Sequence, residues 1–195
     1  MNFSIKEKNE TLRMLGVSLG CAEPELEALV ESVLVECHKI ASVRYVYGLF
    51  DIERVTENCI TLKGSSFTLQ GKDICEHLAG CDTCALMAVT LGAAVDAALL
   101  RYQRTDMTRA VVLDAAASVI ADAAADECEE KILAQAKSLG KKITTRYSPG
   151  YGDFPIECQR EFLNALNCGV RLGLTVTDSC MLLPSKSITA CVGAG

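Results

Sequence analysis

The longest helical pattern in the sequence constrains the fold of this chain more than any other feature. Small and apolar side chains run from Met107 to Leu139 without a proline or glycine, and Gly140 follows where a helix commonly ends. The pattern predicts one long helix over residues 107–139. At about 1.5 Å per residue, such a helix is long enough to cross an entire small domain.

The centre of this helix is rich in alanine. Residues 115–126 are mostly small, which allows another backbone or a bulky ligand to come close. Asp122 and Asp126 lie one helical turn apart and therefore share one helix face. Asp126 is interpreted as part of a solvated acidic edge. Asp122 fits that interpretation less well, because alanines flank it on both sides in an otherwise apolar stretch.

The remaining helices and strands do not alternate regularly along the chain. Helical periodicity predicts further helices over residues 5–15, 23–40, 73–78, 93–102 and 156–166. Runs of β-branched, aromatic or apolar residues predict strands over 42–55, 58–62, 66–69, 84–91, 142–146, 174–176, 179–183 and 187–192. This order disfavours a doubly wound parallel sheet. We expect a single α+β domain over residues 1–195, with a twisted, mostly antiparallel sheet and helices packed on it.

Composition excludes several classes of protein. Half of the 195 residues are hydrophobic, which is ample for a core, and the formal net charge of -6 argues against a general nucleic-acid binder. No apolar run is long enough to span a membrane, and the start of the chain lacks the apolar segment of a signal peptide. We therefore expect a cytoplasmic protein.

A loop between a predicted strand and a predicted helix has the chemistry of a ligand site. It reads Arg-Tyr-Ser-Pro-Gly-Tyr-Gly from Arg146 to Gly152. The guanidinium of Arg146 suits a carboxylate, and Tyr151 offers a flat aromatic face with a hydroxyl at its tip. Pro149 and Gly150 favour a tight turn, and the glycines leave backbone amides open to a ligand. On local chemistry alone, an ordinary turn with a solvated arginine is an equal alternative.

Eleven cysteines are many for a chain of this size. Most lie in apolar runs, as small buried residues do, and a disulfide framework is not expected in a reducing compartment. One group stands apart, because Cys75, His77, Cys81 and Cys84 place four soft ligands in a short segment. Such a group can hold zinc or an iron–sulfur cluster, and Cys81 with Cys84 can form a redox pair. Plain structural thiols are the favoured interpretation, and metal or redox use remains the alternative.

Several motifs within residues 81–195 occur together in one known family. Along the chain they are the turn 90–92, the helix segment 114–130, the Arg-x-x-x-Gly-Tyr of Arg146 to Tyr151 and the segments 177–179 and 184–189. In this order they resemble the activation domain of vitamin B12 (cobalamin)-dependent methionine synthase, here in a free-standing form. The resemblance lies in residues 81–195, whereas residues 1–80, a mixture of helix and strand, match weakly.

The resemblance implies that the chain binds S-adenosylmethionine in an extended groove. Arg146 would hold the carboxylate of the ligand, Asp122 would meet its amino group, and Tyr151 would lie near its methyl group and the corrin face. Lys186 is expected either to touch the ligand or a corrin side chain, or to be a solvated lysine of a strand. The groove would be completed by the loop backbone of Tyr147, Ser148, Pro149 and Gly150.

The sequence departs from the family pattern at three points. It has no tryptophan, so the family's N-terminal Asp-Trp segment, which supplies another ligand acid, has no counterpart. Ser118 stands where the family has a helix acid that faces the cobalamin domain, and Val192 replaces an aromatic residue. A scaffold that has kept the fold and lost the ligand is therefore a further alternative.

The implied function is that of an accessory module rather than a self-sufficient enzyme. The module would support reductive re-methylation of cob(II)alamin on a cobalamin-dependent methionine synthase or a related corrinoid methyltransferase. Cobalamin would arrive on that partner, and the electron would come from a flavodoxin- or ferredoxin-type donor. No acid–base group is required, because the protein's contribution is to align the reacting atoms. The alternative function is a metal, iron–sulfur or thiol redox protein that uses Cys75, His77, Cys81 and Cys84.

Overall fold

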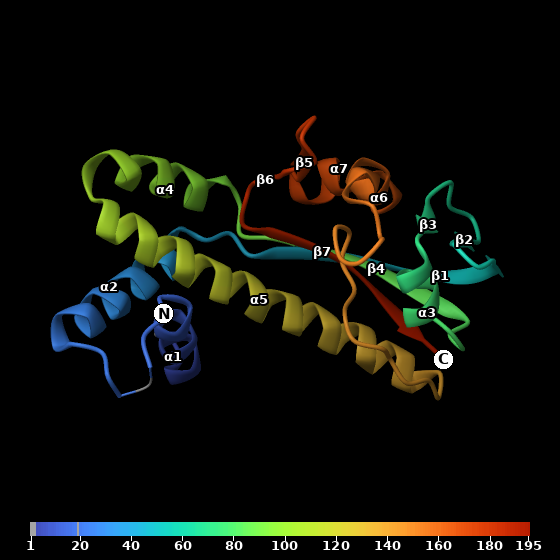
Figure 1. Ribbon diagram of the computed structural model, residues 1–195, viewed down its shortest axis with the longest axis horizontal. Helices are drawn as coiled ribbons and strands as arrows, with labels where there is room; N and C mark the ends of the chain where they lie inside the picture. Colours follow the sequence, from blue (N-terminus) through green and yellow to red (C-terminus); the bar gives the residue numbers. More distant parts are fainter. Residues whose placement is uncertain (1–2, 19) are drawn as a thin grey trace.

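The computed structural model describes residues 3–18 and 20–195. Its longest element is the helix α5 (Met107–Ser138), which runs along the molecule beside a sheet (Figure 1). The carboxylate of Asp106 caps this helix by accepting a hydrogen bond from the backbone N–H of Arg109 at 3.0 Å. The long helix predicted from the sequence is therefore confirmed. None of the described helices is long and apolar enough to cross a membrane.

The main sheet has five strands in the order β3-β2-β1-β4-β7, and its neighbouring strands are antiparallel. A separate antiparallel hairpin pairs β5 (Thr175–Val176) with β6 (Leu182–Leu183). The predicted α+β class with an antiparallel sheet is thereby confirmed. The strands of the main sheet are β1 (Arg44–Val55), β2 (Cys59–Leu62), β3 (Thr68–Gln70), β4 (Thr83–Thr90) and β7 (Ser187–Ala194).

Strand β4 is buried along its whole length because other elements cover both faces of the sheet (Figure 1). One face, with Ala85 and Met87, packs against the second half of α5. The other face, with Leu86 and Ala88, belongs to a core shared with three short helices. Burial on both faces explains why this strand reads as a continuous apolar run. The three short helices are α3 (Lys72–His77), α6 (Gln159–Ala165) and α7 (Cys168–Leu172).

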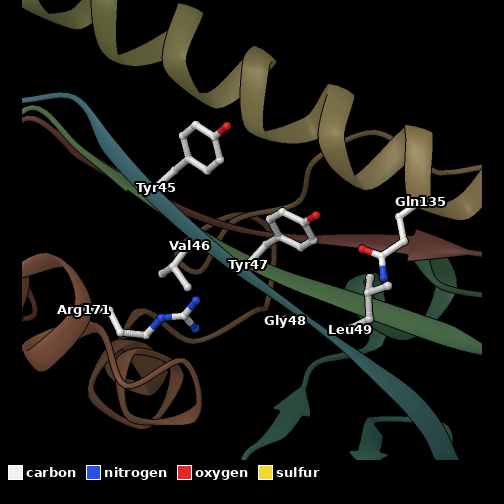
Figure 2. A pocket seen from close by; sticks show the side chains of 7 residues that line it. All are labelled: Tyr45, Val46, Tyr47, Gly48, Leu49, Gln135 and Arg171. Carbon is white, nitrogen blue, oxygen red and sulfur yellow. The ribbon is translucent and has the colours of Figure 1, made fainter.

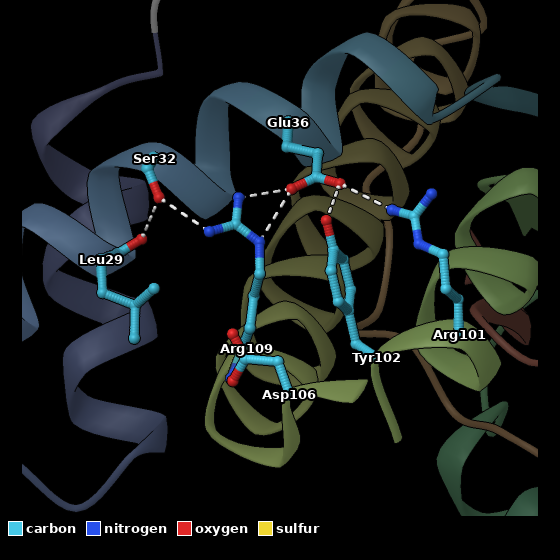
Figure 3. A network of polar contacts seen from close by, with 7 residues as sticks. All are labelled: Leu29, Ser32, Glu36, Arg101, Tyr102, Asp106 and Arg109. Carbon is cyan, nitrogen blue, oxygen red and sulfur yellow. Dashed lines mark hydrogen bonds and ion pairs between the residues drawn. The ribbon is translucent and has the colours of Figure 1, made fainter. Parts of the chain in front are cut away.

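The first half of α5 packs around a second apolar core with α1 (Ile5–Met14), α2 (Pro24–Ile40) and α4 (Ala93–Thr105). A polar network joins three of these helices (Figure 3). Its centre is Glu36 of α2, which accepts hydrogen bonds from the Tyr102 hydroxyl at 2.6 Å and from Nε of Arg109 at 3.1 Å. Burial acts to raise the pKa of Glu36, but these hydrogen bonds and the arginine charges outweigh it, so that the pKa is lowered.

The first part of β1 keeps one edge open. Strand β4 pairs with residues 44–51 on one side, whereas β2 pairs only with the end of β1, from Ile52 onward. A hollow of about 550 Å³ lies along the free edge, between Gln135 of α5 and Arg171 of α7 (Figure 2). The backbone N–H and C=O groups of successive residues in a strand point alternately to its two sides. Those of Tyr45 and Tyr47 point away from β4 and toward this hollow. Among the described strands, none pairs with this edge.

Two predicted strands are wrong in part or in whole. Residues 142–146 form no regular strand, because Ile143 makes only an isolated bridge to Ala194 of β7 and the next bridge, from Tyr147 to Cys191, lies just after the segment. The hydroxyl of Thr144 accepts the backbone N–H of Gly193 at 2.9 Å, and this bond interrupts the backbone ladder. The strand predicted over 179–183 shrinks to β6, because Cys180 has a φ of 62° and belongs to a turn.

The helix predicted over residues 156–166 is confirmed with two differences. It begins as a short 3-10 helix at Ile156–Cys158, and α6 follows directly. The sequence did not predict α7. A residue in the left-handed backbone conformation stands at each end of this helix, Asn167 with a φ of 53° and Gly173 with a φ of 66°. A helix as short as α7 is too brief to show helical periodicity.

Candidate ligand-binding groove

Two adjoining hollows share Asp122 and Arg146 and together form an elongated groove. The larger has a volume of about 540 Å³ and lies between α1 and the middle of α5. The smaller has a volume of about 320 Å³ and lies between α5 and the loop that contains Ser148 and Tyr151. The groove thus brings together the helix acid and the loop arginine that the sequence singled out.

The loop from residue 146 to 152 is folded on itself. The N–H of Gly150 donates to the carbonyl of Phe154 at 2.8 Å, and the N–H of Tyr147 donates to Cys191 at 2.9 Å. These two amides are therefore engaged within the protein, which corrects the expectation that the amide of Gly150 is open to a ligand. Gly152 has a φ of 52°, and a Cβ on it would lie 2.1 Å from Oδ2 of Asp73.

Helix α3 supports this loop from behind. The carboxylate of Asp153 accepts hydrogen bonds from the backbone N–H groups of Lys72 at 2.7 Å and Asp73 at 3.0 Å, at the start of α3. At the other end of α3, the ring of His77 lies against the ring of Tyr147 with centroids 5.0 Å apart. Since Tyr147 lines the smaller hollow, α3 positions a wall of the groove.

The guanidinium of Arg146 is held by two acids of α5. Its Nη2 lies 2.9 Å from Oδ1 of Asp126, and its Nε lies 3.3 Å from Oε2 of Glu129. The third nitrogen, Nη1, is buried and has no hydrogen-bond partner among the described residues. The interpretation of Asp126 as a merely solvated edge residue was wrong, because tertiary packing brings the loop arginine to it.

Asp122 lines both hollows, and its surroundings shift the pKa of its carboxyl. Burial in the groove raises the pKa of its carboxyl, the charge of Arg146 lowers it, and the nearby Asp126 carboxylate raises it again. The net direction is upward, because burial outweighs the charge of Arg146. A cationic group beside Asp122 would act against this shift, since it favours the ionised carboxylate.

Of the remaining predicted site residues, Tyr151 lines the groove and Lys186 lines neither hollow. Tyr151 is 67% exposed and lines the smaller hollow. The ammonium of Lys186 lies 2.8 Å from the Asp114 carboxylate and 2.9 Å from the Ser118 hydroxyl, and its side chain is only 14% exposed. Lys186 is thus not a freely solvated lysine. Its contact with α5 lies one to two helical turns before Asp122.

The first helix supplies groove residues that sequence reasoning missed. Glu7, Glu10 and Arg13 of α1 line the larger hollow opposite Asp122. Burial acts to raise the pKa of Glu7, but hydrogen bonds from Ser4 and the nearby His38 outweigh it and lower the pKa. The only sequence signal was the polar face of the predicted helix 5–15, which also fits plain solvent exposure.

The cysteine group does not form a ligand set. Within the part of the chain that the structure describes, no group of three or more histidine, cysteine or acidic side chains is placed to hold a metal ion. Cys84 is buried in β4, while the His77 ring nitrogen bonds the Thr145 carbonyl at 2.8 Å. Burial also raises the pKa of both Cys75 and Cys81, which disfavours thiolates. The metal-centre alternative therefore lacks a geometric basis.

The structure is that of an α+β domain with a groove beside its longest helix, lined by both acidic and basic side chains. A family model described as the activation domain of vitamin B12 dependent methionine synthase matches residues 72–195. Since this match covers more than half of the chain, the chain belongs to that family, and the resemblance inferred from the sequence is confirmed.

Comparison with solved structures supports the fold over nearly the whole chain. A crystal structure of the MetH reactivation domain bound to AdoHcy superposes with a TM-score of 0.72 at 16% sequence identity. The match covers 99% of this chain and 77% of that chain. Comparison with curated proteins finds no match.

Proposed function

We propose that this chain binds S-adenosylmethionine and supports reductive re-methylation of cob(II)alamin on a cobalamin-dependent methionine synthase or a related corrinoid methyltransferase. The observation that carries the proposal is the groove whose two hollows share Asp122 and Arg146. Residues 1–195 would act as one domain, in which 81–195 provide most ligand contacts and α1 closes one side.

The polar side chains of the groove offer partners for the charges of the ligand. S-adenosylmethionine carries a carboxylate, an ammonium and a sulfonium group. The partly exposed guanidinium of Arg146 suits the carboxylate, and Asp122 suits a cation, which would in turn lower the pKa of Asp122. Tyr151, at the open end of the smaller hollow, can cover a cation with its aromatic face.

The chain's own residues contribute binding and alignment. When bound, S-adenosylmethionine supplies the methyl group, and the reaction needs no general acid or base from this chain. Arg146, Asp122 and the loop from Tyr147 to Tyr151 would fix the orientation of the ligand. The cobalamin would be brought by a partner protein, and a flavodoxin- or ferredoxin-type protein would donate the electron. The MetH reactivation domain with AdoHcy bound is a precedent for this ligand class on this fold.

Calorimetric titration of S-adenosylmethionine into the purified protein tests the proposal. We expect saturable binding by the wild-type protein and a loss of about 2 kcal/mol in Arg146→Ala, because a charge-assisted hydrogen bond is removed. The matched control is Arg160→Ala, since Arg160 pairs at 3.4 Å with the fully exposed Asp178 and does not line the groove. Absence of binding by the wild-type protein at millimolar ligand would refute the proposal.

A further inference from the structure

We infer that Asp126 and Glu129 are positioning residues, which hold the guanidinium of Arg146 in one orientation so that its exposed edge meets the ligand carboxylate. The inference rests on the proposed function, because it assigns a role to the neighbours of the ligand-binding arginine. Both acids lie on α5 at a separation that places them on one helix face.

The two ion pairs fix the orientation of the Arg146 guanidinium. Asp126 engages Nη2 at 2.9 Å and Glu129 engages Nε at 3.3 Å. Because the guanidinium is planar, two fixed nitrogens determine where the third one points. The Arg146 and Glu129 side chains are only 26% and 28% exposed, so this pair is partly shielded from water, whereas Asp126 is 54% exposed. Nη1 is buried, so the part of the Arg146 side chain that remains exposed, 26% in all, is the part that a ligand can meet.

Positioning has a consequence for affinity. An unrestrained arginine side chain loses rotamer freedom when it binds a ligand, and that loss weakens binding. Two acids that already fix the side chain remove most of this cost before the ligand arrives. They also bring negative charge close to the place where a carboxylate must bind, which acts in the opposite direction.

Paired substitutions separate these two effects. Glu129→Gln and Asp126→Asn remove the negative charge but keep an oxygen that accepts the hydrogen bond from Arg146. Glu129→Ala and Asp126→Ala remove both the charge and the acceptor. If the acids act by positioning, the amide variants keep the affinity for S-adenosylmethionine and the alanine variants lose part of it.

The experiment titrates two ligands into the wild-type protein and the four variants. One ligand is S-adenosylmethionine, and the other is its decarboxylated analogue, which lacks the group that Arg146 would hold. For S-adenosylmethionine, we expect Glu129→Ala to weaken binding about fivefold and Asp126→Ala by less, because Asp126 is more exposed. We expect Glu129→Gln and Asp126→Asn to bind within about twofold of wild type. The Glu129 variants should leave the affinity for the decarboxylated analogue unchanged, and the two Asp126 variants should change it equally, because Asp126 also acts on the pKa of Asp122.

Three outcomes would overturn the inference. If the alanine variants bind S-adenosylmethionine as tightly as wild type or more tightly, the acids do not position the arginine and compete with the ligand instead. If they weaken both ligands equally, the acids support the fold and not the carboxylate contact. If the wild-type protein binds neither ligand, the proposed function itself fails, and the inference fails with it.

Discussion

At the scale of single residues, the ligand contact proposed for Asp122 would come at a cost to the stability of the folded protein. Its pKa is raised by burial in the groove, so its ionised form is disfavoured in the folded state above its ordinary pKa. We expect Asp122→Asn to raise the melting temperature of the ligand-free protein at pH 7 and to weaken S-adenosylmethionine binding. Thermal unfolding with and without ligand measures both effects. Equal melting temperatures together with unchanged binding would contradict this role.

The same residue predicts how binding depends on pH. A protonated Asp122 is neutral and no longer attracts a cation, so affinity should fall as the pH drops through the raised pKa of this carboxyl. The decrease should be absent in Asp122→Asn, because that variant has no proton to gain at this position. The sign follows from the ligand, since its cationic group favours the ionised carboxylate.

Glu36 predicts the opposite relation between charge and stability. Its pKa is lowered in the folded protein, so its ionised form stabilises the fold above its ordinary pKa and this stability is lost as the pH falls. We expect Glu36→Gln to reduce the free energy of unfolding by about 1–3 kcal/mol at pH 7, and by less near pH 3. Urea unfolding at both pH values measures this change. Glu25→Gln at an exposed position of the same helix is the control.

At the scale of elements, the conformation of the loop from residue 146 to 152, here called the ligand loop, depends on Gly152 for two reasons. Its φ of 52° disfavours other residues, and an added Cβ would meet Asp73 of α3 at 2.1 Å. We expect Gly152→Ala to lower the free energy of unfolding by about 1–3 kcal/mol more than Gly140→Ala and to weaken ligand binding. Gly140 is a matched control because it also has a positive φ, of 74°, with nothing within 4 Å of an added Cβ. Equal losses in the two variants would show that the contact with α3 is unimportant.

The elements that the sequence predicts well are those whose signal is local. The long helix α5 and the buried strand β4 follow from periodicity and from a continuous apolar run. The strand predicted over 142–146 was wrong because the hydroxyl of Thr144, and not a backbone carbonyl, accepts the N–H of Gly193 in β7. The sequence alone does not reveal this bond. In the groove, Arg146 and Asp122 stood out by residue type and setting. The partners of Arg146 and the contribution of α1 arise from tertiary packing, which no local pattern specifies.

At the scale of the whole molecule, the groove is assembled from segments that are far apart in the sequence. Its walls come from α1, the middle of α5 and the loop after α5 (Figure 1). Residues 72–195, which match the family model, do not include α1. The side of the groove that the first helix forms therefore lies outside the residues that match the family model.

The pairing of β7 with β4 leads us to expect an order in which binding develops during folding. These strands are joined along their full length although about a hundred residues separate them in the chain, and pairings between such distant segments are slow to form. The ligand loop is attached to β7 through Tyr147 and Cys191. A chain in which α5 and its neighbouring helices have already packed would therefore remain unable to bind its ligand until this last strand is in place. Recovery of binding during refolding should lag behind recovery of helix content.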